Sequence, residues 1–342
     1  MMPRSFARAA VLPLLLGGCA YQRYQSDFGA AGVEDRQFLT LFWIFLGVCA
    51  FMYALVIIFL GAGIARSRRA AEANVVETGR HHRSHPLMRS TLIGWAALIG
   101  VGLAGLAIAS FFTDRSMAAA AANEKLSVTV TGNQWWWDIV YNSGDASKTL
   151  RTANELHLPV GVPTRIILNS ADVIHSFWVP QLQGKIDVIP GDTNEVRLFA
   201  SKAGDYRGQC AEFCGAQHAH MAMHVIAEEP AAYESWVESQ RRPAAPPTDS
   251  LATLGQQIFA TQACAVCHTV RGTDALGMIG PDLTHVGSRA TIAAGTLANT
   301  QGNLEAWIAN APALKPGTRM PAMPQLNASQ VRALASYLRS LR

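Results

Sequence analysis

The sequence predicts a multidomain membrane protein, in which a two-helix transmembrane hairpin is followed by a β-sandwich and an all-α domain. Three observations support this prediction. Two long uncharged segments lie in the first 113 residues, short β-rich stretches occupy the middle of the chain, and helical periodicity follows residue 250. The chain has 342 residues, enough for two or three domains, and its 15% of charged residues is low for a wholly soluble protein.

The N-terminus has the layout of a secretory signal. Two arginines precede a short apolar run at 11–16, and small residues follow it. This pattern predicts a signal peptide over residues 1–18 and an exported segment over 19–37. The last residues of the run also resemble a bacterial lipobox, which would make Cys19 the lipidated first residue of the mature chain. The alternative is an ordinary signal peptide followed by an incidental cysteine.

Two uncharged segments are each long enough to cross a bilayer, since a transmembrane helix needs about 20 apolar residues. Residues 37–65 form a run of 29 uncharged residues, and residues 90–113 form a run of 24. We place transmembrane helices at 38–65 and 90–113. The loop between them, residues 66–89, holds six arginines and two glutamates. The positive-inside rule therefore predicts a cytoplasmic loop and an exported remainder of the chain.

Charge is distributed unevenly along the chain. Residues 1–122 carry 11 Lys and Arg against 6 Asp and Glu, residues 123–240 carry 8 against 14, and residues 250–342 carry 7 against 3. The basic excess lies beside the spans or in a short domain, and no basic surface is interleaved with aromatic residues. This distribution argues against a nucleic-acid-binding protein.

Residues 123–240 contain short β-rich stretches separated by Gly, Pro and Asn. They lie at 127–131, 135–141, 164–169, 175–179, 194–199 and 224–227. Strands at this spacing predict an antiparallel sandwich or barrel. A proline-rich segment at 241–250 then predicts an extended, semi-rigid linker.

The C-terminal part, residues 251–342, is predicted to be helical. Its apolar spacing predicts helices over 254–260, 304–310 and 329–341. Asn327 and Gln330 are spaced as a capping box at the start of the last helix.

Several potential metal ligands gather at the C-terminal edge of the β-rich region. Cys210 and Cys214 are followed by His218 and Met221, and His175 lies 35 residues upstream of Cys210. Thiolate, imidazole and thioether groups favour copper, and two cysteines in one loop can bridge two copper ions that share one electron. For the cysteine pair alone, a disulfide or a zinc site is the alternative.

The string Cys-x-Glu-x-Cys-x3-His-x2-Met at 210–221, with His-Ser-Phe-Trp at 175–178, resembles the dinuclear copper (CuA) motif of cytochrome c oxidase subunit II. The resemblance covers about residues 30–230 and implies a cupredoxin-like sandwich after two spans. The copper ligands that it implies are the Glu212 backbone carbonyl and the side chains of His175, Cys210, Cys214, His218 and Met221. In this family the glutamate carboxylate faces a magnesium site shared with subunit I.

The segment Gly132-Asn-Gln-Trp135-Trp136-Trp137 resembles the aromatic run of the same family, whose first tryptophan passes electrons to copper. Three consecutive tryptophans are also compatible with sandwich core or with anchors at a membrane interface. We take Trp135 as the residue through which electrons enter and the next two as structural. Quinol oxidases share the fold but lack the copper ligands, so the ligand set implies a cytochrome c as donor.

The segment Cys264-Ala-Val-Cys267-His268 is a C-x-x-C-H motif, in which two cysteines bind haem through thioethers and the histidine is an axial ligand of the iron. A redox or zinc C-x-x-C is the alternative, which the lack of a second ligand pair in this region disfavours. The segment Pro-Gly-Thr-Arg-Met320-Pro resembles the loop that supplies the sixth ligand in class I cytochromes c. It implies Met320, with Met323 as the second candidate.

Other residues near the two motifs also carry expectations. Gly280-Pro281 resembles the loop whose proline carbonyl orients the haem histidine. His220, His224 and His285 have no place in either motif. We expect His220 and His285 at the surface and His224 in a strand.

These features predict subunit II of a haem-copper cytochrome c oxidase with a fused haem c. The resemblance implies a bacterial inner membrane, subunits I and III as partners, and a cytochrome c or bc1-type complex as donor. Electrons would pass from the haem through Trp135 to copper, and then to subunit I, where oxygen is reduced and protons are pumped. We expect the basic C-terminal domain to dock on the acidic β-domain near Trp135.

Two competing hypotheses have the same metal-binding residues. One is an electron-transfer subunit of another respiratory reductase, and the other is a quinol-binding subunit with relic cysteines. The chain also departs from the family in one respect. The family commonly has a glutamate at the cytoplasmic end of the second span, near a proton channel of subunit I, whereas no Asp or Glu occurs between Arg80 and Phe112.

Overall fold

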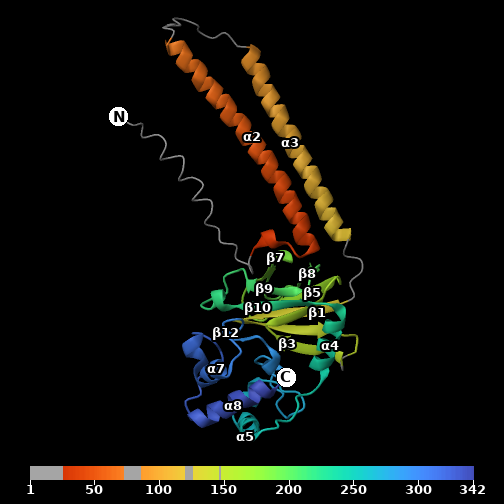
Figure 1. The fold of residues 1–342 in the computed structure, drawn as a ribbon, viewed down its shortest axis with the longest axis vertical. Helices are drawn as coiled ribbons and strands as arrows, with labels where there is room; N and C mark the ends of the chain where they lie inside the picture. Colours follow the sequence, from red (N-terminus) through yellow and green to blue (C-terminus); the bar gives the residue numbers. More distant parts are fainter. Residues whose placement is uncertain (1–25, 73–85, 120–125, 146–147) are drawn as a thin grey trace, which may run out of the picture. The chain divides into compact units, whose positions relative to one another are not determined.

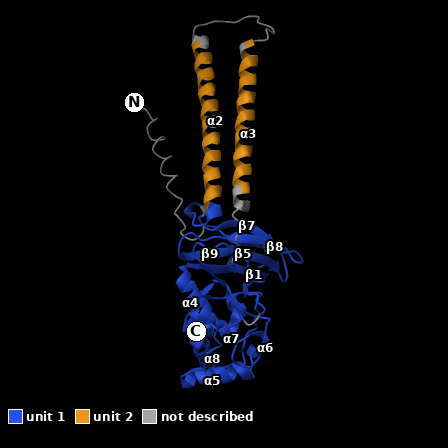
Figure 2. Ribbon diagram, turned by 90° about the vertical axis from the view of Figure 1, so that its right-hand side faces the viewer, with its two compact units in different colours: residues 1–35, 123–342 blue, residues 36–122 orange. Residues whose placement is uncertain are grey.

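The computed structural model describes residues 26–72, 86–119, 126–145 and 148–342 (Figure 1). The predicted signal peptide, Cys19 and residues 73–85 of the predicted loop lie outside the described residues. Residues 36–122 form one compact unit, and residues 1–35 with 123–342 form the other (Figure 2).

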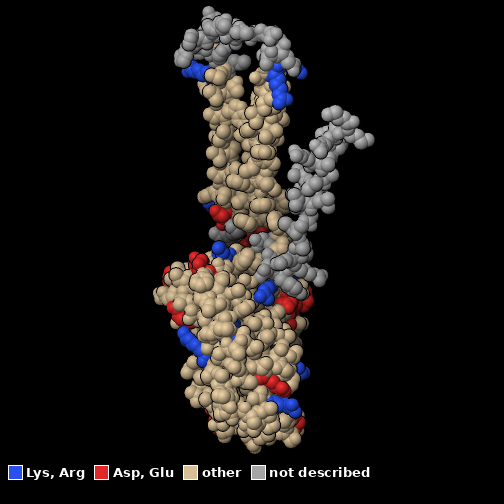
Figure 3. Space-filling view, turned by 90° about the vertical axis from the view of Figure 1, so that its left-hand side faces the viewer, with Lys and Arg blue, Asp and Glu red and all other residues tan. Residues whose placement is uncertain are grey.

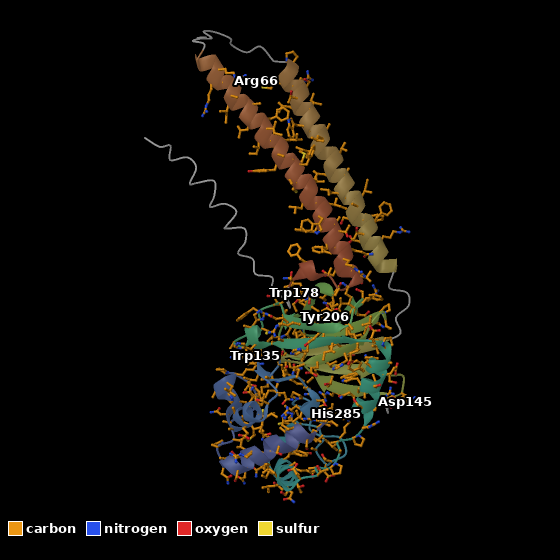
Figure 4. All side chains as sticks on the ribbon, in the orientation of Figure 1. Arg66, Trp135, Asp145, Trp178, Tyr206 and His285 are labelled. Atoms are coloured by element: carbon orange, nitrogen blue, oxygen red, sulfur yellow. The ribbon has the colours of Figure 1, made fainter. Side chains whose placement is uncertain are left out.

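The unit of residues 36–122, orange in Figure 2, is built from two long apolar helices, α2 (Val33–Glu72) and α3 (Pro86–Ala119). Both are long and apolar enough to cross a membrane. They contact each other edge to face through Phe59 and Trp95, whose ring centroids are 5.6 Å apart. Figure 3 shows few charged side chains along the helices, and Figure 4 shows Arg66 near the C-terminal end of α2. Their exposed aliphatic and aromatic side chains match a lipid environment.

Helix α2 extends beyond the predicted span at both ends. Glu34 and Asp35 lie in its first turn, where carboxylates interact favourably with the helix dipole. At the other end, alanines and arginines are good helix formers, so the helix continues past the apolar run.

The β-rich region forms a sandwich of two five-stranded sheets, which confirms the sandwich over the barrel. The first sheet has the order β3 (Leu150–Ala153), β2 (Trp136–Asn142), β1 (Leu126–Asn133), β5 (Thr164–Ser170), β8 (Asn194–Leu198). The second has the order β4 (Glu155–Pro159), β10 (Ala222–Glu228), β9 (Gly204–Cys210), β6 (His175–Val179), β7 (Gln183–Val188).

All six predicted strands are present, and β3, β4, β7 and β9 are additional. The prediction of an antiparallel sandwich was wrong for two strand pairs, because β1 pairs with β5 and β4 pairs with β10 in parallel. Alternating residues of β1, among them Val128 and Val130, face the core between the sheets. Trp137 is fully buried there and packs edge to face against Phe177, with ring centroids 6.0 Å apart.

Helix α4 (Pro230–Arg241) closes one edge of the sandwich. Its Trp236 stacks on His157 with ring centroids 4.0 Å apart. The proline-rich segment that follows has no helix or strand over residues 243–248, and it is attached to the C-terminal domain. The Ala244 amide donates to the Arg271 carbonyl at 2.8 Å.

His285 also contacts this linker, and the expectation that it lies at the surface was wrong. The residue is only 5% exposed, and its Nε2 lies 3.0 Å from the Arg242 carbonyl. The linker covers the imidazole, a contact between distant segments that local sequence does not reveal.

The C-terminal residues form a helical domain, which we define as residues 250–342. Its helices are α5 (Ser250–Thr261), α6 (Cys264–Cys267), α7 (Gln301–Leu314) and α8 (Ala328–Ser340). A short hairpin pairs β11 (Thr291–Ile292) with β12 (Leu297–Ala298). The predicted capping box of Asn327 and Gln330 is present at the start of α8.

Helices α5 and α8 cross in close contact at Gly255. A Cβ at this position would lie 2.0 Å from the Ala333 carbonyl oxygen, so only glycine fits without displacing α8. We expect Gly255→Ala to destabilise the helical domain by about 3 kcal/mol, the upper part of the usual range for overpacking. Calorimetry of the full-length chain would measure this effect as a lower transition temperature of the helical domain.

Gly302, in the first turn of α7, provides the matched control. A Cβ there meets no atom within 4 Å, and alanine favours the helical conformation, so Gly302→Ala should leave that transition unchanged or raise it. Equal transition temperatures for the two variants would show that the close contact between α5 and α8 is unimportant.

Candidate metal and haem sites

Two cysteine sulfur atoms lie at the centre of the first site. Strand β9 ends at Cys210, and the loop that follows carries Cys214 before the short helix η4 (His218–His220). The two Sγ atoms are 3.7 Å apart, and both cysteines are buried and free of disulfides. The Glu212 carbonyl oxygen lies 3.2 Å from the Cys210 sulfur.

The other predicted ligands converge on these two sulfurs. His175, at the start of β6, places Nδ1 3.9 Å from the Cys210 sulfur. His218 Nδ1 lies 3.7 Å and Met221 Sδ lies 3.8 Å from the Cys214 sulfur. The six donor atoms named from the sequence therefore surround one small volume, and thiolate, imidazole and thioether donors suit copper.

The His175 ring is held in orientation by its neighbours. Its Nε2 lies 2.9 Å from a carboxylate oxygen of Asp172, which leaves Nδ1 to face the sulfurs. A Cβ at Gly132 would lie 2.7 Å from the ring, so a glycine is required there. Asp172 was not predicted from the sequence, although a carboxylate three residues before a predicted ligand is a recognisable signal for an orienting partner.

The pKa values of the two thiols are shifted in opposite directions. The contact between the two sulfur atoms lowers the pKa of Cys210 and raises the pKa of Cys214. Burial lowers the pKa of His175, but its contacts with Cys210 and Asp172 outweigh burial and raise it overall. The polar contacts thus stabilise negative charge on one sulfur, which is the form that binds metal.

Trp135 lies directly beside this loop. Its indole Nε1 donates a hydrogen bond to the Cys214 carbonyl at 3.0 Å. Trp135 is only 8% exposed, and Gly317 of the helical domain lies against its ring: a Cβ there would lie 2.9 Å from the indole. Figure 4 shows Trp135 where the β-sandwich meets the helical domain. Trp137 is in the core, as expected of a structural residue, whereas Trp136 lines the cavity described next.

A large cavity, predominantly apolar, opens in the helical domain and reaches Trp135 and Trp136. All the residues predicted to hold haem line it: Cys264, Cys267, His268, Met320 and Met323. Phe259, Ile308 and Leu334 contribute to its apolar wall.

His268 is arranged to present one nitrogen to this cavity. Its Nδ1 lies 2.8 Å from the Pro281 carbonyl, the contact that the Gly280-Pro281 resemblance implied. Because Nδ1 donates to this carbonyl, Nε2 is free to coordinate iron. Burial lowers the pKa of His268, which favours the neutral imidazole. A Cβ at Gly280 would lie 2.6 Å from the ring, so the loop closes on the imidazole only at a glycine. These residues fit a haem attached through the C-x-x-C-H motif.

Met320 and Met323 differ in their surroundings. Met323 is buried, its amide donates to the Ala309 carbonyl at 3.0 Å, and its sulfur lies 3.4 Å from Nε2 of Gln325. Met320 is partly buried in the preceding loop. The sulfur of Met323 already has a polar partner, which favours Met320 as the ligand.

Lys315 is a further polar residue of the cavity that the sequence analysis missed. Its Nζ lies 2.8 Å from the carbonyl oxygens of Trp135 and His220 and 2.9 Å from that of Ala293. It is the single lysine between residues 250 and 342, but its neighbours in the sequence give no indication of these distant partners. His220 itself is exposed and His224 lies in β10, as expected.

Comparison with known proteins identifies both parts of the chain. Residues 126–228 match the family model of the cytochrome c oxidase subunit II periplasmic domain, and residues 252–342 match that of cytochrome c. The chain is 32% identical over 337 residues to cytochrome c oxidase subunit 2 of Alkalihalophilus pseudofirmus, covering 98% of this chain and 96% of that protein. It is 29% identical to the subunit 2 of Bacillus subtilis, covering 97% of this chain and 96% of that protein.

Among solved structures, the periplasmic domain of subunit II of the Bradyrhizobium japonicum cytochrome oxidase is 33% identical. It covers 35% of this chain and 95% of that chain, with a TM-score of 0.33.

Proposed function

The chain belongs to the cytochrome c oxidase subunit II family, and from this premise we propose that it receives electrons at a fused haem c and passes them through a dinuclear copper centre to subunit I. The observation that carries this proposal is the position of Trp135. Its indole contacts the copper-binding loop through the Cys214 carbonyl, and Trp135 is also among the residues that line the haem cavity.

The cupredoxin-like sandwich would hold the copper pair. The proposed side-chain ligands are His175, Cys210, Cys214, His218 and Met221, with Glu212 contributing its carbonyl. Strands β6 and β9 of the second sheet and the loop between β9 and β10 would hold these donors, which limits their movement when the charge of the site changes. The Glu212 carboxylate is exposed, so we propose that it faces a magnesium ion at the contact with subunit I.

The cytochrome c domain would hold the haem. Cys264 and Cys267 would form the thioethers, and His268 and Met320 would be the axial ligands. When bound, the haem and the copper pair each take up and release one electron. A histidine and methionine pair gives a relatively high haem potential, which suits a carrier between a cytochrome c and copper.

Two apolar helices and the periplasmic-domain family indicate a membrane protein with an exported domain. We propose a bacterial inner membrane, with the arginine-rich loop in the cytoplasm and both cofactor domains in the periplasm. Subunits I and III are the proposed partners, and a cytochrome c or a bc1-type complex is the proposed donor. Oxygen reduction to water with proton pumping would take place in subunit I.

Metal and haem analysis of the purified full-length chain tests this proposal. We expect two copper ions and one covalently attached haem per chain, together with an electron paramagnetic resonance signal of one electron shared between two copper nuclei. Zinc, a single copper ion or a disulfide at Cys210 and Cys214 would contradict it.

The rival hypothesis of another respiratory reductase needs a separate measurement. The chain should copurify with a large membrane subunit that contains haem, and this complex should consume oxygen when supplied with reduced cytochrome c. A complex that reduces a nitrogen oxide and not oxygen would favour the rival.

A further inference from the structure

The ammonium group of Lys315 lies in a buried cage of backbone carbonyls. Lys315 follows the last turn of α7 and is only 2% exposed. Its Nζ has three donor hydrogens, and its three carbonyl partners lie at 2.8, 2.8 and 2.9 Å. All three hydrogens therefore have acceptors, and each bond is strengthened by the positive charge.

The cage connects the two cofactor domains. The carbonyls of Trp135 and His220 belong to the β-sandwich domain, and that of Ala293 belongs to the cytochrome c domain. Trp135 is the residue between the two cofactor sites, and His220 lies next to the proposed ligand Met221. The Lys315 ammonium thus bonds to the segments that border both sites.

The residues after Lys315 continue this contact. The side-chain amide of Gln217, in the copper-binding loop, donates to the Pro316 carbonyl at 3.0 Å. Gly317 then lies against the Trp135 indole. Three residues later the same loop reaches Met320, the proposed iron ligand. The position of the haem-binding loop is therefore coupled to that of Lys315.

The three carbonyl acceptors favour the charged form of Lys315 despite its burial. Burial lowers the pKa of its amine to about 8, and the nearby Cys214 sulfur acts in the opposite direction. A buried ammonium without acceptors is strongly unfavourable, so separating the two domains would require rehydration of this group.

We propose that Lys315 is a positioning residue that keeps the cytochrome c domain docked on the copper domain, with the haem cavity, Trp135 and the copper-binding loop in one fixed arrangement. This inference rests on the proposed function. It also differs from the expectation, based on the sequence, that the two domains dock through attraction between a broad basic surface and a broad acidic surface. The ion pair between Arg319 and Asp172 spans 3.6 Å and Arg319 is 68% exposed, so this pair contributes little.

The step that Lys315 supports is a single electron transfer. A bound haem would give up one electron and a bound copper pair would take up that electron, so the step would balance without another reactant. No covalent bond forms or breaks. Lys315 itself exchanges neither electrons nor protons, so its contribution is to geometry alone.

Replacement of Lys315 by methionine tests the proposal in the full-length chain loaded with copper and haem. Methionine fills similar space but removes the three bonds. After photoreduction of the haem by a ruthenium dye, we expect the rate of electron transfer to copper to fall by about tenfold or more, because the docked arrangement is less populated. Lys202→Met is the control: Lys202 is exposed on the copper domain, and the rate should not change.

Solvent viscosity provides a readout that a purely structural defect would not affect. In the unchanged chain the transfer rate should be independent of added sucrose, since no domain has to move. In Lys315→Met the rate should fall as viscosity rises, while the haem and copper spectra stay the same. Measuring the unchanged chain keeps the test decisive even where the variant loses a cofactor.

Three outcomes separate this inference from the proposed function. An unchanged chain with a viscosity-dependent rate, or a methionine variant with an undiminished rate, would overturn the role of Lys315 alone. An unchanged chain in which reduced haem never reduces copper would overturn the proposed function. We expect a rate that is independent of viscosity in the unchanged chain and a slower, viscosity-dependent rate in Lys315→Met. This pair of results supports both the role of Lys315 and the proposed function.

Discussion

Replacing Cys214 by serine is expected to remove the dinuclear copper centre and to lower copper affinity by about hundredfold or more. Loss of a ligand's orienting partner already costs roughly ten- to hundredfold in metal affinity, and here a ligand itself is lost. The Cys214 sulfur lies within 3.8 Å of the donor atoms of Cys210, His218 and Met221, so it contacts three other proposed ligands. A serine hydroxyl is a harder donor and a poor ligand for copper.

Copper analysis and electron paramagnetic resonance would measure this loss, and flash photoreduction would show that electrons remain on the haem. Cys49→Ser is the matched control, because Cys49 is a free cysteine exposed on α2, far along the chain from either motif. It should keep two copper ions per chain. A Cys214→Ser variant that retained two copper ions and the shared-electron signal would rule out the bridging role.

The proposed copper ligands could be named from the sequence because most of them lie in one short segment. The exception, His175, is brought to the site by strand pairing: β6 pairs with β9 so that Phe177 lies opposite Cys210. Side chains two apart on a strand share a face, so His175 and Phe177 point to the same side. The sequence indicated the types of the ligand residues and a strand at His175. The fold supplied the register between that strand and β9, which brings His175 to the cysteines.

Strand β4 shows why other parts could not be predicted. All five of its residues are buried, although Glu155 and His157 are polar. Glu155 accepts a hydrogen bond from the Ala290 amide of the helical domain at 2.7 Å, and His157 lies 2.9 Å from Glu228. Burial of polar side chains depends on partners far away in the sequence. The same reason explains why Lys315 was missed and why His285 was expected at the surface.

Replacing Met320 by alanine is expected to lower the haem potential by on the order of 0.1 V or more, since axial ligands set haem potentials over about 0.8 V. The haem itself should remain, because the proposed thioethers to Cys264 and Cys267 do not involve Met320. A lower potential makes reduction of the haem by a cytochrome c unfavourable, so oxidase turnover with that donor should fall with it. Spectroelectrochemical titration of the full-length chain measures the potential, and the pyridine haemochrome spectrum measures haem content.

Met323→Ala distinguishes the two candidate ligands. Met323 is 9% exposed and its sulfur contacts Gln325, so its truncation should act through packing and destabilise the domain by roughly 2–5 kcal/mol, with the potential unchanged. A normal potential in Met320→Ala with a low one in Met323→Ala would reverse the assignment. Met320 lies in the loop that Lys315 attaches to the copper domain. A lower potential in Met320→Ala than in Met323→Ala would therefore also mean that the iron ligand and the docking contact belong to one continuous segment.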